Sequence, residues 1–313
     1  MPDYALLISP RADAAYFAQT DDVARAELAG ALPKAEISAT SFGDLRFLNV
    51  SAAAHDLPKL LRLSFVQGIF QVGESGLIPI EDTSNFKLHP DFVWGEKYRG
   101  KTNETLTQLL INLSLQANPE ATSLCDPMCG RGTTLLWAMR YGLKATGVEQ
   151  DPLALQDIQR GLKKWTKLHS QKHKLTQGWI QKSNKKGTGR FLEFSAEGTS
   201  MRVITGDTAH APELFQNRKF DILATDIPYG IQHMGGKNSR SPIETLKDAA
   251  SGWAKSLKPN GVLAIAFNSY MPKRAELVAI FAEQKLKEIE TNVAHRMSGS
   301  ILRDVVLMQK PDR

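Results

Sequence analysis

The chain has 313 residues, 42% of them hydrophobic and 23% charged, a composition that suits two globular domains and excludes fibrous or disordered proteins. The net charge of +6 is uneven: the first hundred residues carry 9 basic and 13 acidic side chains, and the rest carry 30 and 20. Two cysteines are too few for a disulfide framework, and no apolar run reaches the length of a membrane span. We therefore expect a cytoplasmic protein without a signal peptide, with Cys125 as a buried strand residue.

Residues 1–85 predict a small α+β domain. Strands are expected at 4–9, 37–50 (two strands turned at Gly43) and 65–72, and helices at 20–32 and 56–63. Asp21 and Asp56 are the expected N-caps of these helices. The order strand-helix-strand-strand-helix-strand is the ferredoxin-like pattern. Residues 86–102 are expected to link this domain to the second domain, 103–313.

The second domain alternates strands and helices, which predicts a doubly wound α/β fold whose parallel sheet is covered on both faces. Its expected strands are 122–126, 144–149, 201–205, 219–225, 261–267, 287–294 and 301–309. Its expected helices are 103–117, 132–141, 152–166, 208–216, 243–257 and 272–285. The last two strands are joined by the polar loop HRMSGS, so they should pair as an antiparallel hairpin. Ligands of such sheets bind beyond the carboxyl ends of the strands.

A glycine-rich loop follows the first strand of this domain, in SLCDPMCGRGTTLLWAM. Gly130 and Gly132 allow the backbone to approach a ligand and expose helix N-terminal amides to it. The next strand ends in Glu149, where an acid accepts hydrogen bonds from ribose hydroxyls. Dinucleotide enzymes share this pattern, so it predicts an adenosine ligand without separating NAD from the others.

Two further strand ends carry a more specific signal, because TGDT is followed by TDIPYG. With DPMCGRG and GVEQD before them, the four motifs resemble class I S-adenosylmethionine-dependent amino-methyltransferases over residues 90–313. The TDIPYG form, the preceding EKYRGKTNE and the first domain are similar to the THUMP-associated tRNA guanine-N2 methyltransferases that modify the guanosine at position ten. The resemblance implies a Rossmann-like methyltransferase sheet, S-adenosylmethionine as cofactor and RNA, most simply tRNA, as partner. A small activating protein partner is left open.

The resemblance also implies roles for individual residues. Those that would hold the cofactor are Asp126, Gly130 and Gly132 at its methionine end, Glu149 at its ribose, Asp207 at its adenine, and Thr102 and Asn103 at its carboxylate. Asp226, Pro228 and Tyr229 would face the substrate base as the catalytic residues. Chemistry favours this assignment, since a carboxylate and a backbone carbonyl that accept the two protons of an aromatic amine free its lone pair for methylation. No metal is needed, and none of the seven histidines has partners in metal-ligand spacing.

Three features depart from the family pattern or extend it. Ile227 replaces the first proline of the usual Pro-Pro pair, and about 85 residues before the linker are too few to include a THUMP module. A basic insert at 161–192 has nine Lys and Arg and no acid, with Trp165, Trp179 and Phe191 interspersed. That combination is typical of a polyanion-binding surface. We expect Lys182, Lys185 and Lys186 of this insert to contact RNA in place of the missing module, or else the insert to be a solvated loop.

The loop IQHMGGKNSRSP at 231–242 is glycine-rich, and Lys237 and Arg240 would contact RNA phosphates if it closes over the target nucleotide. Other hypotheses remain for the whole chain. The same motif chemistry serves amino-methylation of adenine-N6 or cytosine-N4 in DNA, of ribosomal RNA, or of a protein glutamine. A non-catalytic RNA-binding protein that retains a cofactor pocket is the last alternative. The sequence does not indicate the oligomeric state or how many methyl groups are added.

Overall fold

The computed structural model describes residues 1–98, 101–182, 185–227, 242–298 and 301–312. The chain forms two compact units. The first comprises Met1–Asn85 and Thr291–Asp304, and the second comprises Phe86–Glu290 and Val305–Arg313.

The first unit contains an antiparallel sheet in the order β2-β3-β1-β4-β5. The strands are β1 (Asp3–Ile8), β2 (Ile37–Phe42), β3 (Leu45–Ser51), β4 (Val66–Gly73) and β5 (Gly76–Pro79). β1 lies in the middle and pairs with β3 on one side and β4 on the other. The first four strands have the ferredoxin-like order that the sequence predicts, and β5 adds an edge strand that it does not.

The helices of this unit correct two capping predictions. They are α1 (Pro10–Tyr16), η1 (Phe17–Gln19), α2 (Thr20–Ala31), η2 (Ala54–Asp56) and α3 (Leu57–Leu60). The N-cap of α2 is Gln19 and not Asp21, whose carboxylate instead bonds Arg46 of β3 at 2.7 Å. Asp56 does occupy the N-cap position of α3, but its side chain accepts no capping hydrogen bond. α1 was missed, although Ser9 caps it and Pro10 follows.

Residues 291–304 contribute to the core of the first unit. His295 is 1% exposed; its ring meets the edge of Tyr16 with centroids 4.9 Å apart, and its Nδ1 lies 2.9 Å from the Val293 carbonyl. Burial is the main reason that the pKa of His295 is lowered. Tyr16 continues the polar cluster through its hydroxyl, 2.7 Å from that of Ser64, which donates to buried Glu27.

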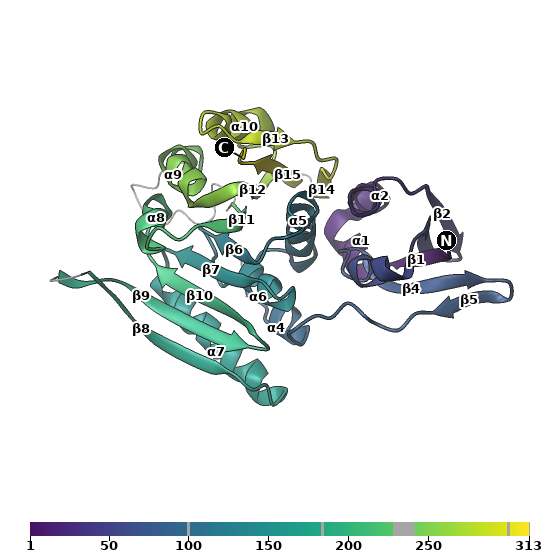
Figure 1. Cartoon of the computed structure of the whole chain (residues 1–313), viewed down its shortest axis with the longest axis horizontal. Coiled ribbons are helices and arrows are strands. Elements are labelled where there is room, and N and C mark those ends of the chain that lie inside the picture. The colour runs from purple at the N-terminus through teal and green to yellow at the C-terminus, as the bar shows by residue number, and fades with distance from the viewer. Residues whose placement is uncertain (99–100, 183–184, 228–241, 299–300, 313) are drawn as a thin grey trace. The chain divides into compact units, whose positions relative to one another are not determined.

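A ten-stranded sheet, most of it in the second unit, has the order β13-β15-β12-β11-β6-β7-β10-β9-β8, with β14 paired to β15 (Figure 1). β14 and the first residues of β15 belong to the first unit. The strands of this sheet are β6 (Ser123–Asp126), β7 (Lys144–Glu149), β8 (Lys174–Lys182), β9 (Lys185–Ala196), β10 (Thr199–Thr205), β11 (Phe220–Asp226), β12 (Leu257–Asn268), β13 (Lys287–Ile289), β14 (His295–Ser298) and β15 (Ile301–Gln309). The central strands β12, β11, β6, β7 and β10 are mutually parallel. This is the doubly wound order of a class I methyltransferase sheet, as the sequence predicts.

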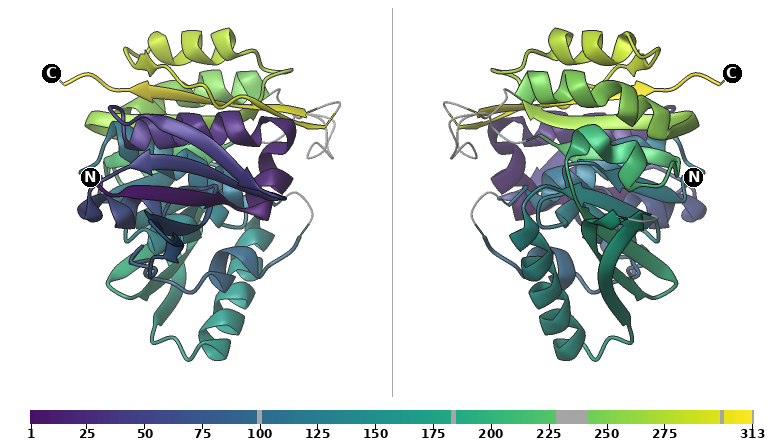
Figure 2. Two further views of the ribbon diagram at one scale, coloured as in Figure 1. Left: turned by 90° about the vertical axis from the view of Figure 1, so that its right-hand side faces the viewer. Right: turned by 90° about the vertical axis from the view of Figure 1, so that its left-hand side faces the viewer.

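Helices cover both faces of this sheet. They are α4 (Asp91–Trp94), α5 (Glu104–Ala117), α6 (Thr133–Arg140), α7 (Pro152–Leu168), η3 (Thr208–His210), α8 (Ala211–Leu214), α9 (Pro242–Ser256) and α10 (Arg274–Ala282). Figure 2 shows α9 and α10 on one side of the sheet and α7 on the opposite side. Trp137 of α6 and Trp253 of α9 are both fully buried, so each helical layer contributes an indole to the core. Residues 86–102, expected to be a linker, include α4 and bury Phe92 and Val93.

Two strand predictions near the ends of the sheet are corrected. The antiparallel closing hairpin is present, as β13 against β15, but β13 ends at Ile289 instead of 294. The stretch HRMS, expected to be a loop, is strand β14. The insert at 161–192 is not a loop either: α7 continues to Leu168, and a long β8–β9 hairpin then adds two antiparallel strands beside β10.

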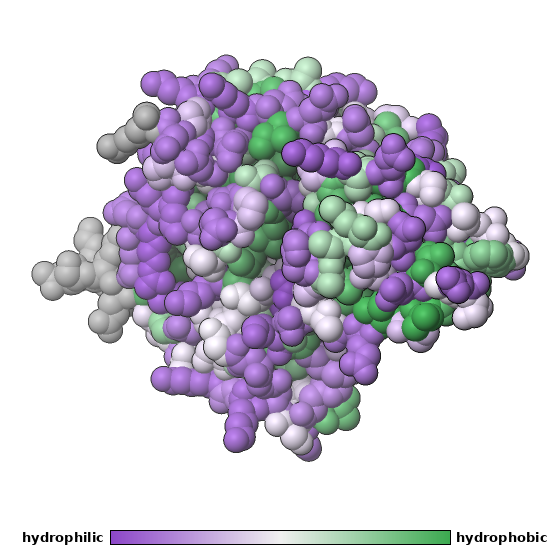
Figure 3. Space-filling model, turned by 45° about the vertical axis from the view of Figure 1, so that its right-hand side comes forward, coloured by the Kyte–Doolittle hydropathy of each residue, from purple (hydrophilic) through white to green (hydrophobic). Residues whose placement is uncertain are grey.

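The surface seen in Figure 3 is mainly hydrophilic, with apolar residues in small groups. Among the described residues, no helix combines the length and apolarity needed to cross a bilayer.

Candidate active site at the carboxyl edge of the sheet

The parallel strands bring four of the predicted acids to one edge. β6 ends at Asp126, β7 at Glu149 and β11 at Asp226, and Asp207 follows β10 by two residues. Because these strands run in one direction, their carboxyl ends share that edge. β6 has β7 as its neighbour on one side and β11 on the other. The strand order changes direction at this position, so Asp126 and Asp226 flank the topological switch point. Ligands of doubly wound sheets bind at such a point.

Asp126 is a strongly perturbed acid. Its side chain is buried, with the residue 2% exposed, and its Oδ1 accepts a 3.0 Å hydrogen bond from the Met128 amide. Burial is the main reason that the pKa of Asp126 is raised to about 7; the nearby Asp226 carboxylate adds to this, and hydrogen bonds from Thr225, the Met128 amide and Thr134 oppose it. Asp126 therefore exchanges its proton near neutral pH.

The glycine loop lies directly beside Glu149. Gly130 has φ +52° and Gly132 has φ +82°, conformations that side chains disfavour. The Gly130 amide donates to Glu149 Oε2 at 2.8 Å, and the Asp151 amide donates to Oε1 at 2.8 Å. A Cβ added at Gly130 meets no atom within 4 Å, so open space lies beside the loop. The structure thus brings Gly130 and Glu149 together, as a shared cofactor site requires.

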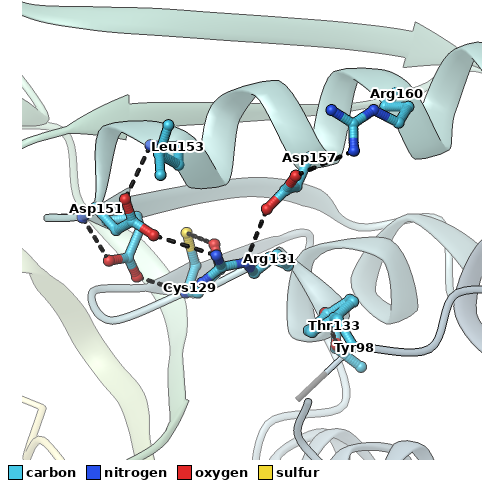
Figure 4. A network of polar contacts seen from close by, with 10 residues as sticks. Tyr98, Cys129, Arg131, Thr133, Asp151, Leu153, Asp157 and Arg160 are labelled. Carbon is cyan, nitrogen blue, oxygen red and sulfur yellow. Dashed lines mark hydrogen bonds and ion pairs between the residues drawn. The ribbon is translucent and has the colours of Figure 1, made fainter. Parts of the chain in front are cut away.

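Arg131 connects this loop to the start of α7 through ion pairs (Figure 4). Its guanidinium makes two ion pairs of 3.2 Å, one with Asp151 and one with Asp157. Its Cζ also lies 5.9 Å from the ring centre of Tyr98, whose hydroxyl is 3.3 Å from that of Thr133. Burial raises the pKa of Tyr98 to about 12, so its hydroxyl stays protonated at neutral pH.

Sequence reasoning assigned no role to Arg131 or Tyr98. A signal for Arg131 existed: the arginine stands between two loop glycines, and two acids six residues apart begin the helix after the next strand. The signal for Tyr98 was weaker, because the tyrosine belongs to a segment expected to be a linker.

Gly147 of β7 is a third residue to which the sequence patterns assign no role. A Cβ there would lie 2.7 Å from Cys129 Sγ and 2.8 Å from Leu135 Cδ1. Because Gly147 has no Cβ, the glycine loop can pack closely against β7. We expect Gly147→Ala to lower the free energy of unfolding by roughly 1–3 kcal/mol, the usual cost of overpacking a core.

Urea unfolding measures this effect, and Gly161→Ala on α7 is the matched control. A Cβ at Gly161 meets its nearest atom, Glu96 Cγ, at an ordinary 3.5 Å. Helix propensity then favours alanine, so this variant should equal or exceed the parent in stability. Equal stability of the Gly147→Ala variant and the parent would show that the loop does not depend on this close contact.

The remaining predicted cofactor residues lie at helix starts. Asn103 is the N-cap of α5, where its Oδ1 accepts from the Leu106 amide at 3.0 Å, and Thr102 precedes it. Asp207 is exposed and caps η3 by accepting from the Ala209 amide at 2.9 Å. These bonds fix the backbone at each position; they leave contact with a cofactor as a prediction.

The end of β11 fixes the predicted catalytic aspartate. Asp226 pairs with Ala266 of β12 in the parallel register, and the following Ile227 amide donates to the Ala266 carbonyl at 3.0 Å. Ile227 is 3% exposed, so the residue that replaces the usual proline is anchored in the core. Pro228, Tyr229, Lys237 and Arg240 lie outside the described residues.

The β8–β9 hairpin carries the residues predicted to bind RNA. Lys182 ends β8, and Lys185 and Lys186 begin β9, although their side chains lie outside the described part. Two of the three aromatic residues proposed for RNA contact are unavailable. Trp165 is 8% exposed on α7, and the half-buried Phe191 is covered by Arg202, whose Cζ lies 4.4 Å from its ring centre.

A histidine cluster forms away from this edge, where His169 joins His89 and Asp91 from a distant part of the sequence. The rings of His89 and His169 stack with centroids 3.6 Å apart and planes 24° from parallel. Asp91 Oδ2 lies 3.0 Å from His169 Nε2 and 3.5 Å from His89 Nδ1. The nitrogen lone pairs lie in the ring planes, so stacking directs them side by side. The arrangement suits an ion pair with Asp91 better than three bonds to one cation.

Comparison with known proteins gives one match at the level of sequence families. Residues 96–299 match the family model described as RMKL-like, methyltransferase domain. A search of curated proteins gives no match.

Solved structures with a similar fold are distant. TrmN from Thermus thermophilus is 15% identical with a TM-score of 0.42, over 88% of this chain and 60% of TrmN, so the chain spans less than two thirds of that protein. The rRNA methyltransferase aviRa from Streptomyces viridochromogenes is 16% identical with a TM-score of 0.44, over 73% and 93% of the two chains. The N-methyltransferase NodS from Bradyrhizobium japonicum, in complex with S-adenosyl-L-homocysteine, is 14% identical with a TM-score of 0.44, over 67% and 88%.

Proposed function

The chain belongs to the RMKL-like methyltransferase-domain family, and from this premise we propose that it methylates RNA, at the exocyclic N2 amine of a guanosine in tRNA. Its methyl donor is S-adenosylmethionine. The observation that carries the proposal is the position of Asp226, which ends β11 at the switch point and begins the TDIPYG motif. The single-proline form of that motif favours guanine-N2 over the DNA amines that the double-proline form serves.

The residues at the sheet edge fit this cofactor. Open space lies beside Gly130, and backbone amides hold both oxygens of Glu149, that of Gly130 in the loop and that of Asp151 at the start of α7. We assign the ribose to Glu149, the adenine to Asp207, and the methionine end to Asp126, Gly130 and Gly132. Thr102 and Asn103 would meet the cofactor carboxylate near the start of α5. Bound there, S-adenosylmethionine supplies a methyl group activated by its sulfonium.

Asp226 has the chemistry that an aromatic amine needs. The lone pair of such an amine is delocalised into the ring, which makes the nitrogen a poor nucleophile. The Asp226 carboxylate and the backbone carbonyl of Ile227 or Pro228 accept the two amino protons, so that the nitrogen pyramidalises and exposes its lone pair. Tyr229 stacks on the base. Since a paired base cannot reach this position, the substrate base is flipped out or already unpaired.

The basic hairpin supports RNA as the substrate. Lys182, Lys185 and Lys186 stand on either side of its turn in the sequence, and residues 161–192 contain nine basic residues and no acid. A surface of this kind neutralises phosphates and gives affinity without sequence preference. It would replace the grip on tRNA that a THUMP module supplies in the family that the motifs resemble.

Nucleoside mass spectrometry tests the proposal. Purified protein and S-adenosylmethionine are incubated, in separate reactions, with unmodified tRNA and with duplex DNA. We expect N2-methylguanosine in the tRNA and no methylated base in the DNA. Methyladenine or methylcytosine in the DNA would assign the chain to another amino-methylase class, and absence of product from both would contradict the proposal.

A further inference from the structure

Trp179 is the exposed tryptophan of the chain. It is 62% exposed on β8, whereas Trp137, Trp165 and Trp253 are buried and Trp94 is half-buried. A single exposed apolar side chain is common on protein surfaces, so the neighbours of Trp179 decide whether its exposure has a function.

A cation stands beside this indole. Trp179 pairs directly with Arg190 across the antiparallel hairpin, which places both side chains on the same face of the two strands. The Arg190 guanidinium carbon lies 5.9 Å from the ring centre of Trp179. Together the two side chains match one nucleotide: the indole face can stack on its base, and the guanidinium can neutralise its phosphate.

The strand register puts this pair at the substrate edge of the sheet. Phe191 of β9 aligns with Ile204 of β10, so Arg190 lies level with Thr205, where β10 ends. The Arg190 amide donates to Thr205 Oγ1 at 2.7 Å and confirms that alignment. Figure 1 shows the turn end of the hairpin extending past the neighbouring strands. Trp179 and Arg190 therefore share the edge that holds Glu149, Asp207 and Asp226.

Distance along the edge separates the pair from the catalytic aspartate. Arg190 on β9 is four strand spacings from β11, through β10, β7 and β6, and Trp179 on β8 is five. At ~4.8 Å per spacing the separations are about 19 Å and about 24 Å. A base that stacks on Trp179 is thus not the base that Asp226 contacts, but one a few nucleotides away on the same strand.

We propose that Trp179 and Arg190 form a stacking platform for a single-stranded stretch of RNA that flanks the methylated nucleotide. The inference rests on the proposed function, because it assumes an RNA substrate. It assigns a binding role to side chains that the motif resemblance does not cover. Stacking is tolerant of sequence, so the platform selects unpaired over duplex RNA and not one base over another.

Fluorescence anisotropy of a labelled oligouridylate tests the platform in the full chain, since this polymer stays single-stranded. We expect Trp179→Ala to weaken binding roughly tenfold, as loss of one stacked base does, without changing the salt dependence. Trp179→Phe should retain most of the affinity. Arg190→Ala should lower the salt slope by about one, the value for one phosphate contact.

The matched control is Phe42→Ala, because Phe42 in the first unit is also 62% exposed. Its affinity should equal that of the parent. Iodide quenching gives a second readout: RNA should protect the exposed indole in the parent, and Trp179→Phe should show no such protection. Parent-like binding by Trp179→Ala, no binding by the parent, or equal loss in Phe42→Ala would each overturn the platform.

Methyl transfer separates this inference from the proposed function. If the parent methylates tRNA while Trp179→Ala binds oligouridylate as the parent does, the platform alone is wrong. If the parent binds oligouridylate through Trp179 and methylates no RNA, the platform stands and the proposed activity is wrong. Where both hold, Trp179→Ala should raise the KM for tRNA and leave kcat unchanged.

Discussion

Replacement of Asp226 by alanine should reduce methyl transfer to tRNA by roughly 10²–10⁴-fold, the range that positioned proton acceptors contribute. The aspartate ends β11 and is fixed there by its pairing with β12. Removing the carboxylate leaves one amino proton of the base without its acceptor, so the nitrogen lone pair stays in the ring. Asp226→Asn keeps one carbonyl oxygen as an acceptor and should retain more activity than the alanine variant.

Cofactor binding, measured by isothermal titration calorimetry, shows whether the loss is chemical. Asp226→Ala should bind S-adenosylmethionine about as well as the parent, because the residues assigned to the cofactor are unchanged. Asp44→Ala, at an exposed acid in the turn between β2 and β3, should have full activity. Full activity of Asp226→Ala would refute the assigned role, and joint loss of binding and activity would indicate a structural role.

A second large effect should appear in the pH dependence of stability, at Asp126. Its pKa in the folded chain is about 7, well above that of an unfolded aspartate, because the carboxyl group is buried. Between these two values the folded state keeps a proton that the unfolded state has lost, so stability falls as pH rises from about 4 to about 7. The penalty is absent below that window and complete above it.

Asp126→Asn removes this titration and keeps an oxygen to accept from the Met128 amide. The variant should therefore gain stability over the parent with rising pH, by roughly 2–3 kcal/mol between pH 5 and pH 8. Urea unfolding followed by tryptophan fluorescence suits the measurement, because all five tryptophans belong to the second unit. A stability difference that is the same at both pH values would show that Asp126 does not titrate in this window.

A doubly wound parallel sheet could be predicted from the sequence, because its core strands are short, apolar and bounded by turn residues, but strands β8, β9 and β14 could not. Each strand end that carries a motif acid was located to within a residue or two, since a glycine or proline, such as Pro127, Gly206 or Pro228, stands close to it in the sequence.

The β8–β9 hairpin was not predicted. Leu175, Gln177 and Trp179 lie on one face of β8, but the polar residue among them and the neighbouring lysines hide the apolar-polar alternation typical of a strand. Charged residues suggest a solvent-exposed loop, but a two-stranded hairpin beyond the edge of a sheet is also exposed and can carry the same charges.

The candidate site was predicted in its acids and glycines but not in what supports them. Arg131, Tyr98 and Gly147 act through contacts between segments distant in sequence, and spacing in a single sequence does not show such contacts. Trp165 illustrates the converse. It lies within a basic run that suggests RNA contact, yet its helical spacing with Ile158 and Leu162 puts it on the buried face of α7. For predicting whether Trp165 is buried, its helical spacing is a better guide than the basic composition around it.

The composition of the first unit determines when it can fold during synthesis. Residues 1–85 leave the ribosome before residues 86–290, but the unit also needs Thr291–Asp304, which are made only after that stretch. Until then Tyr16 lacks the ring of His295 against it. The methyltransferase sheet has nearly all its strands before the small unit that precedes it in sequence is complete. Deleting residues 1–85 therefore does not remove a complete domain, because it exposes His295 and the rest of Thr291–Asp304, which pack within the same unit.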